Sequence, residues 1–281
     1  MVRSTIPFAT RVLAFSLLWG AAPPASAQSA RQSSSSPLGM VATAQPLATE
    51  AGVLMLKMGG NAADAAVAAA FAIAVVEPTM NSIGGRNQIL IRLPDGSFHG
   101  IDGTTQAPED YDYDTAPKAS YGYPVIGIPG AVAGLTRLHA RYGRLPLDQV
   151  MAPAIDYAER GFRLLPGEAI REAAGMEQGR EFPGTREAYL EADGTPYDPA
   201  DLLRQPDYAR TLTAIAAGGH HAFYRGEIAE RMAADLGACP SHAVGRAQGV
   251  LRVLMVGTTT RRSCSYGKEE RRRMSPQHPC A

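Results

Sequence analysis

Residues 62–76, with the sequence AADAAVAAAFAIAVV, constrain the fold more than any other segment, because a helix of this composition has almost no polar face. Asn61 is placed to cap such a helix, Asp64 suits its N-terminus, and Glu77-Pro78 predicts its end. The run is too short to cross a membrane. We therefore expect a buried core helix, which requires a globular protein that covers it on several sides.

The rest of the body contains both helical and strand patterns. Apolar residues spaced three and four apart predict helices, whereas short apolar runs beside turn residues predict strands. The Pro94-Asp95-Gly96 turn predicts a hairpin. We expect strands at 39–44, 88–93, 97–102 and 125–128, helices at 47–58, 131–143 and 147–161, and a mostly helical, polar region at 165–235. This order predicts a mixed α/β fold of the α+β kind.

The first 27 residues have the order of a secretory signal peptide. Arg3 and Arg11 belong to a basic start, residues 12–22 are apolar, and Ala25-Ser26-Ala27 has the form of a cleavage site. We expect a polar leader at 28–37 and an exported protein, periplasmic or secreted. The apolar run is too short for a stable membrane span. A retained anchor is the alternative interpretation.

The last 45 residues differ in charge and in cysteine content from the body. Residues 237–281 hold seven arginines and one lysine against two glutamates, a net charge of +6, so residues 1–236 carry −6. A body without cysteine suits an exported protein, and three cysteines cannot all pair within one chain. We interpret 237–281 as a divergent tail, frameshifted or disordered, and a genuine divergent C-terminus is the alternative. The tail contains all the cysteines, Cys239, Cys264 and Cys280.

Five segments of the body carry a family resemblance. They are GMVATAQPLATEAGVLMLKMGGNAADAAVAAAFAIAVVEP at 39–78, SIGG at 82–85, IDGTTQAP at 101–108, VIGIPGAVAGLTRLHARYG at 125–143 and PAIDYAERGF at 153–162. In this order they resemble the large-subunit half of the gamma-glutamyltransferase family. The resemblance covers residues 38–236. It implies an N-terminal-nucleophile hydrolase with an αββα sandwich, incomplete in this chain, made as a longer precursor that cuts itself into two subunits.

The resemblance also implies the chemistry. In that family the new N-terminal threonine of the small subunit attacks a gamma-glutamyl amide, as in glutathione, and its own α-amine is the base. An unperturbed α-amine has a pKa of about 8, so it can accept a proton once the preceding peptide bond is cut. No cofactor is implied. The family threonine stands in a Thr-Thr-His context, whereas Thr258-Thr259-Thr260 is followed by Arg261. We assign no catalytic residue here and expect an inactive chain that lacks its small-subunit partner.

One substrate-binding position departs from the family pattern. Family members bind the substrate α-carboxylate with an arginine, whose planar fork matches a carboxylate, at the position that Thr104 occupies here. A hydroxyl carries no charge, so we expect either a different acyl group or another cation. Arg86, in Gly84-Gly85-Arg86, is the candidate cation. A solvated loop arginine is the alternative, since exposed charge is the common case.

An acidic loop resembles a calcium site only in part. Asp110, Asp112 and Asp114 have the alternating spacing of calcium ligands, but Thr115 stands where glycine is needed and Tyr121 where a glutamate is needed. We expect a solvated acidic loop without a metal.

Two further clusters predict no binding. His220 and His221 are adjacent, so on a helix they should point in different directions and share no metal. Arg271-Arg272-Arg273 lacks an aromatic platform for nucleic acid.

Two other functions stay open. Related acylases remove a glutaryl-type side chain from beta-lactams, and the loss of arginine at Thr104 is compatible with that substrate. A non-catalytic partner subunit, whose missing half another chain supplies, is the second. If half of the layered core is absent, we also expect unpaired strand edges and incomplete cover of the 62–76 helix.

Overall fold

The computed structural model describes residues 35–37, 39–107, 111–116 and 118–238. The chain divides into two units, residues 1–40 and 41–281, and only 35–37, 39 and 40 of the first are described. The predicted signal peptide, most of the polar leader, Thr258-Thr259-Thr260, the three cysteines and the arginine cluster lie outside the described residues. The architecture below is that of the second unit.

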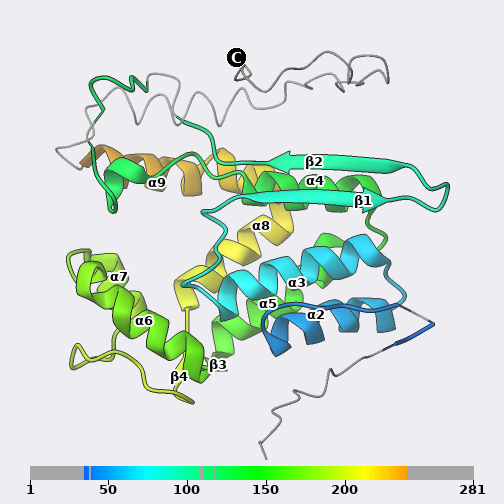
Figure 1. The fold of residues 1–281 in the computed structure, drawn as a ribbon, viewed down its shortest axis with the longest axis horizontal. Coiled ribbons are helices and arrows are strands. Elements are labelled where there is room, and N and C mark those ends of the chain that lie inside the picture. Colours follow the sequence, from blue (N-terminus) through cyan, green and yellow to red (C-terminus); the bar gives the residue numbers. More distant parts are fainter. Residues whose placement is uncertain (1–34, 38, 108–110, 117, 239–281) are drawn as a thin grey trace, which may run out of the picture. The chain divides into compact units, whose positions relative to one another are not determined.

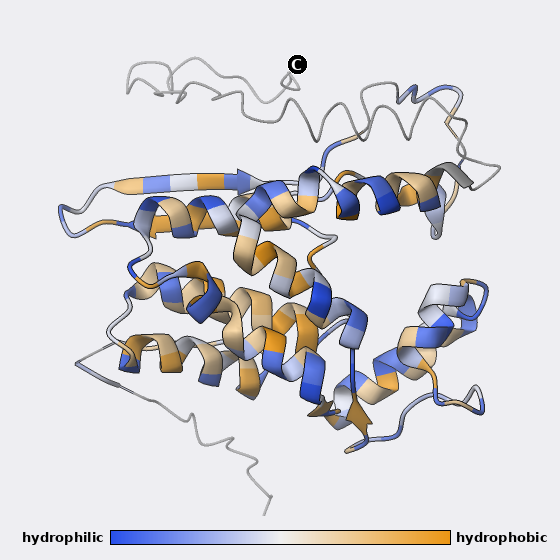
Figure 2. Cartoon of the chain, turned by 180° about the vertical axis from the view of Figure 1, so that it is seen from behind, coloured by the Kyte–Doolittle hydropathy of each residue, from blue (hydrophilic) through white to orange (hydrophobic). Residues whose placement is uncertain are grey.

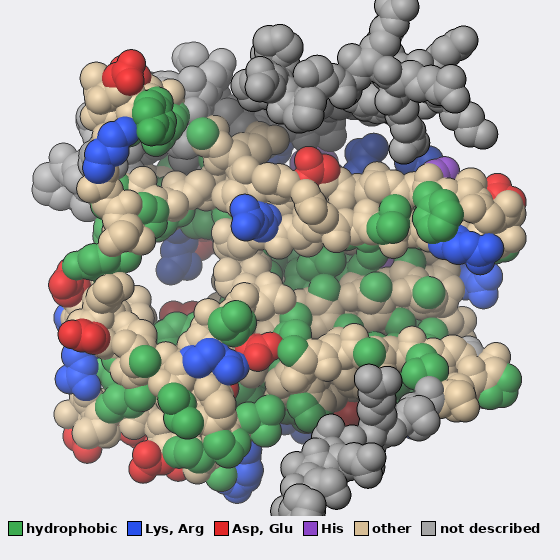
Figure 3. Space-filling model, in the orientation of Figure 1, with side chains coloured by type: hydrophobic (Ala, Val, Ile, Leu, Met, Phe, Trp, Pro, Cys, Tyr) green, Lys and Arg blue, Asp and Glu red, His purple; other side chains and the backbone are tan. Residues whose placement is uncertain are grey.

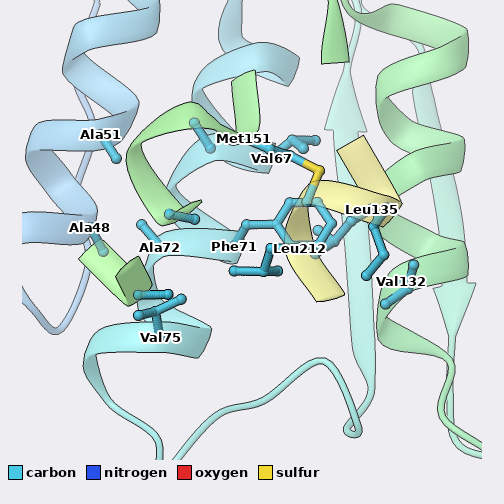
Figure 4. Close-up of a cluster of buried hydrophobic side chains, with 14 of the residues drawn as sticks. Ala48, Ala51, Val67, Phe71, Ala72, Val75, Val132, Leu135, Met151 and Leu212 are labelled. Carbon is cyan, nitrogen blue, oxygen red and sulfur yellow. The ribbon is translucent and has the colours of Figure 1, made fainter. Parts of the chain in front are cut away.

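Helix α3 (Ala62–Val76) forms the centre of the core, as its sequence predicts. It packs against α2 (Pro46–Lys57), α4 (Ala131–Tyr142) and α5 (Leu147–Arg160), and α5 packs in turn against α8 (Pro206–Tyr224) (Figure 1). Figure 4 shows Phe71 of α3 amid side chains from all four of these helices. The hydropathy colouring of Figure 2 shows apolar residues gathered where the core helices face one another.

The expected lack of cover over α3 is wrong for most of this helix. Val67, Phe71 and Val75 are fully buried, and only Ala62 and Ala66 are exposed. Small alanine side chains let α2 approach closely, so helices alone supply the cover. No helix among the described residues has both the length and the hydrophobicity needed to cross a membrane.

Strands β1 (Asn87–Arg92) and β2 (Phe98–Gly103) form the predicted antiparallel hairpin. Gly96 supplies the positive φ of 85° at its turn, where Asp95 accepts the N–H of Ser97 at 2.9 Å. Figure 1 shows the hairpin lying along α4. Alternate residues of β2 are the less exposed ones, among them the buried Ile101. The opposite face presents Leu90 and Phe98 to solvent, and neither edge pairs with another strand of the described region. Figure 3 shows hydrophobic side chains exposed on the outer surface of this part of the molecule.

Between α5 and α8 the chain makes an excursion that we call the α6–α7 arm, residues 162–203. It leaves through β3 (Phe162–Arg163), forms α6 (Pro166–Gly179) and α7 (Pro183–Tyr189), and returns through β4 (Leu202–Leu203), which pairs antiparallel with β3. After α8 comes α9 (Glu227–Ala238). The region predicted as mostly helical is confirmed, and Figure 1 shows the arm leaving and returning at the same place.

Two predicted strands do not form. Residues 39–44 have no strand pairing in the described part of the chain. Residues 125–128 instead begin with the end of a short 3₁₀ turn, η1 (Tyr123–Val125), and only Ile128 forms an isolated bridge, with Gln106. An apolar run does not specify a strand unless a neighbouring strand accepts its hydrogen bonds, and Val125 and Ile126 stay about half exposed.

Candidate active-site edge of the hairpin

The two candidate substrate-binding residues lie at the same end of the hairpin. Asn87 and Gly103 are cross-strand partners, so Arg86 immediately before Asn87 and Thr104 immediately after Gly103 flank the open end. They are far from the Pro94-Asp95-Gly96 turn, at the other end of both strands. The hairpin register in the structure therefore brings to one end two residues that are 18 positions apart in sequence.

The start of α4 clamps this open end. The backbone N–H groups of Gly130 and Ala131 both donate to the carbonyl oxygen of Gly85, at 3.0 and 3.1 Å. The side-chain amide of Asn87 donates to the carbonyl oxygen of Ala131 at 2.8 Å. A Cβ atom at Gly130 would overlap the carbonyl oxygens of Gly103 and Thr104, so only glycine permits this approach. The backbone that carries both candidate residues is thus held firmly.

Thr104 is already engaged with a neighbouring carboxylate. Its backbone N–H donates to Asp102 Oδ1 at 3.0 Å, and its hydroxyl donates to the same oxygen. Asp102 is exposed, and its negative charge opposes a carboxylate at the position of the hydroxyl. The end of β2 therefore supplies no cation for an anionic group.

Arg86 is exposed and has no hydrogen bond or ion pair with any residue in the described ranges. Gly84 and Gly85 precede it, and neither has a side chain that could crowd the guanidinium. An unpaired arginine immediately before β1 is a positive charge that this edge offers to a ligand.

Asn87 is a site residue that the sequence reasoning missed. Its Oδ1 atom is buried without a hydrogen-bond partner among the described residues, and it lies against Gly103 and Gly134. A polar residue on the inward face of a strand whose other inward positions are Ile89 and Ile91 is the signal that could have found it.

The described part of the acidic loop is held by hydrogen bonds of its own. Asp112 accepts the N–H of Asp114 and the hydroxyl of Thr115, both at 2.9 Å, and these hydrogen bonds lower the pKa of Asp112. The loop is exposed, as expected, although Asp110 lies outside the described residues. Across the described ranges, no three His, Cys, Asp or Glu side chains are placed to hold a metal ion.

The expectation that His220 and His221 point apart is wrong. Their ring centroids are 4.1 Å apart with an interplanar angle of 35°, because Gly219, with φ 62° and ψ −152°, breaks the helical geometry just before them. Burial lowers the pKa of His220, and the neighbouring His221 and Arg225 lower it further.

The ordered elements around this edge agree with the comparisons with known proteins. A family model described as gamma-glutamyltranspeptidase matches residues 48–249. The chain belongs to the gamma-glutamyltranspeptidase family. Its fold is therefore that of the N-terminal-nucleophile hydrolases, in the α+β class, as the sequence predicts.

Three relatives of this family illustrate the match. The glutathione hydrolase proenzyme of Pseudomonas sp. (strain A14) is 37% identical over 209 residues, which are 71% of this chain and 36% of that protein. The acylase ACY 1 proenzyme of Pseudomonas sp. (strain SE83) is 41% identical over 207 residues, 68% of this chain and 37% of that protein. The crystal structure of Helicobacter pylori gamma-glutamyltranspeptidase superimposes with a TM-score of 0.70 at 31% identity, covering 73% of this chain and 61% of that one.

The chain therefore spans little more than a third of the length of these two curated relatives.

Proposed function

We propose that this chain is the N-terminal part of an exported gamma-glutamyl enzyme, which hydrolyses or transfers the gamma-glutamyl group of substrates such as glutathione. The nucleophilic threonine would belong to a further part of the precursor. In this proposal residues 1–27 are a signal peptide, 28–37 a polar leader, 38–236 the large-subunit region and 237–281 a divergent tail. The observation that carries it is the ordered family match from residue 48 onward, together with a relative named as a glutathione hydrolase proenzyme.

The described residues support a positioning role for this part of the enzyme. They contain a rigid edge, formed by β1, β2 and the start of α4, that presents Arg86 beside Thr104. The proposed chemistry needs the N-terminal threonine of a small subunit as nucleophile and base, and we assign that threonine to the other subunit of the precursor. We propose that this edge binds the acyl part of the substrate and that the missing part supplies the reaction.

Arg86 is proposed as the cation that pairs with the substrate carboxylate in place of an arginine at position 104. It lies at the same end of the hairpin as Thr104, next to the paired Asn87 and Gly103, and has no competing partner in the described part of the chain. A guanidinium pairs with a carboxylate through two parallel hydrogen bonds, which a hydroxyl cannot reproduce.

A glutaryl-type acylase is the second candidate, and one specific observation favours it. The acylase relative is 41% identical to this chain, against 37% for the glutathione hydrolase relative. A glutaryl group resembles a gamma-glutamyl group without its α-amino group, so both would offer Arg86 a carboxylate. The relative rates of the completed enzyme on gamma-glutamyl and glutaryl anilides separate the two activities.

The testing experiment reads the encoding DNA and then measures hydrolysis. We expect that translation in another frame across codons 230–245 continues the family pattern to a Thr-Thr-His segment. The purified 281-residue chain should release no aniline from a gamma-glutamyl anilide, whereas the restored precursor should cut itself and become active. Hydrolysis by the 281-residue chain would overturn the assignment of the nucleophile to another part of the precursor. If the family pattern is absent from all three frames, the frameshift interpretation of residues 237–281 is rejected. The interpretation of this chain as a non-catalytic partner subunit is then favoured.

A further inference from the structure

Helix α6 carries two buried carboxyl groups, Glu168 and Glu172, of which only Glu168 has hydrogen-bond partners among the described residues. Glu168, only 2% exposed, accepts the N–H and the hydroxyl of Thr79 at 2.9 and 2.7 Å and pairs with Arg171. Glu172, one turn further along the helix and 1% exposed, has no hydrogen-bond partner at either carboxyl oxygen among the described residues. A buried carboxylate without a partner is costly, so Glu172 requires either a cation or a proton.

The neighbouring Arg171 already pairs with other carboxylates. Arg171 pairs with both Glu168 and Glu77, the latter at 2.9 Å, and its Nε donates to the hydroxyl of Thr79 at 3.1 Å. One guanidinium thus already serves two carboxylates. A third negative charge at Glu172 would have no compensation from α6 or from the end of α3.

The arginines of the neighbouring helices have other partners among the described residues: Arg186 of α7 donates to the carbonyl oxygen of Arg180, and Arg210 of α8 pairs with Asp207. Tyr189 of α7 and Tyr197 of the following segment lie close enough to feel the charge of Glu172, and Tyr208 of α8 adjoins Tyr189. The acidic residues that face the same tyrosines are Glu168, Glu191 and Asp201. Burial, together with the nearby charge of Glu168, raises the pKa of Glu172 to about 7. The Glu172 carboxyl group therefore holds a proton in acid and loses it as the pH rises past about 7.

We propose that Glu172 is a proton-operated latch that holds the α6–α7 arm against the end of α3. With its proton, the carboxyl is neutral and stays buried beside Tyr189. Without the proton, the charged Glu172 carboxylate is more stable in water than in the buried site, so α6 moves outward. The hydrogen bonds between Glu168 of α6 and Thr79 then weaken. Thr79 belongs to the segment that joins α3 to β1 and carries Arg86, so the latch acts on the backbone leading to the hairpin edge.

The sign of the pH dependence follows from the direction of the shift. Because the pKa of Glu172 is higher in the closed arm than its ordinary value of 4.5, the closed arm is most stable below about pH 4.5. Its stability falls as the pH rises toward about 7 and levels off above that value. The latch is therefore closed in acid and released once the pH has risen to about 7.

Hydrogen–deuterium exchange on the full 281-residue chain tests this latch. We expect peptides from residues 166–189 to open on the order of tenfold more often at about pH 8.5 than at about pH 5.5, after correction for intrinsic exchange. Peptides from α3 and α5 should keep their protection. Glu172→Gln and Glu172→Met should remove the pH response and keep the arm closed, whereas Glu177→Gln, at an exposed position of the same helix, should respond like the wild type.

Three outcomes contradict the proposal. The first is equal protection of the arm at both pH values in the wild type. The second is a pH response that survives in both Glu172 variants. The third is an arm that is open at both pH values in both variants, which would show that Glu172 acts through its shape and not through its proton.

Discussion

The buried carboxylate of Asp64 accepts the backbone N–H of Arg144, 80 positions further along the chain, at 3.0 and 3.1 Å from its two oxygens. The same carboxylate accepts the N–H of Asn61 at 2.8 Å and that of Leu145 at 3.3 Å. One side chain therefore both caps α3 and fixes the loop between α4 and α5. In return, the Asn61 amide donates to the carbonyl oxygen of Tyr142 at 2.6 Å.

Replacement of Asp64 by alanine should lower the free energy of unfolding by about 2–4 kcal/mol, because several buried N–H groups lose their acceptor at once. Urea denaturation of the full chain measures the change. Asp156→Asn, which removes only the exposed pair with Arg160, should cost less than about 1 kcal/mol. Equal losses for the two variants would contradict the role of Asp64 as a tie between distant segments.

Replacement of Phe71 by alanine should cost about 3–5 kcal/mol, because a cavity would open at the centre of the helical core. Phe71 is fully buried and contacts the core cluster. Ile170→Ala is the matched control, since Ile170 is 68% exposed and its truncation should change stability by less than about 0.5 kcal/mol. Chemical denaturation of both variants measures the change, as the shift in the denaturant midpoint when the slope m of the unfolding free energy against denaturant concentration is unchanged.

Replacement of Gly130 by alanine should lower the melting temperature, because the new methyl group overlaps the carbonyl oxygens of Gly103 and Thr104. Gly175→Ala should do the opposite. Gly175 lies inside α6 with no neighbouring atom in the way, so alanine there should stabilise the helix by up to about 1 kcal/mol. A Gly130→Ala chain that melts at the wild-type temperature would show that the hairpin edge is not held tightly.

Replacement of Arg86 by alanine should raise KM for a carboxylate-bearing acyl substrate about tenfold in the completed enzyme, because a charge-assisted hydrogen bond is lost. The value of kcat should change less. Arg92→Ala, an exposed position at the other end of β1, serves as the control and should leave KM unchanged. Equal KM effects for both arginines would indicate general charge attraction in place of a specific contact.

Introduction of arginine at Thr104 tests the same edge from the opposite strand. Thr104→Arg should lower KM for gamma-glutamyl substrates in the completed enzyme, since it restores a permanent charge beside Asp102. If the arginine introduced at position 104 takes over the binding of the substrate carboxylate from Arg86, the double variant Thr104→Arg/Arg86→Ala should keep the lowered KM. Steady-state kinetics on a gamma-glutamyl anilide distinguish this from independent effects.

The sequence predicted the elements whose signals are local. Asn61 and Asp64 form a capping box that sets the start of α3, and Gly161, with φ 89°, ends α5 where predicted. The hairpin followed from its three-residue turn, and the observed pairing of Asn87 with Gly103 then places Arg86 and Thr104 at the same end of it.

The errors concern relationships between distant residues. A strand at 125–128 required a neighbouring strand, and only Gln106 pairs there. The close approach of the His220 and His221 rings, which are tilted by 35°, follows a break in the helical backbone at Gly219. The isolation of Glu172 has no local sequence signal, because it depends on which elements pack against α6. Asn87 did have a signal, its polar side chain on the face that Ile89 and Ile91 share, and the sequence reasoning did not use it.

The short pairing of β3 with β4 closes the α6–α7 arm at its base. Leu164 N–H donates to the carbonyl oxygen of Asp201 at 3.0 Å, and Ala200 N–H donates to that of Leu164 at 2.9 Å, so the two strands are stitched together at the base of the arm. A chain that enters and leaves an excursion at one place can lengthen, shorten or exchange it without reordering the core helices. The α6–α7 arm is therefore where proteins of this architecture can diversify at the least cost to their folding.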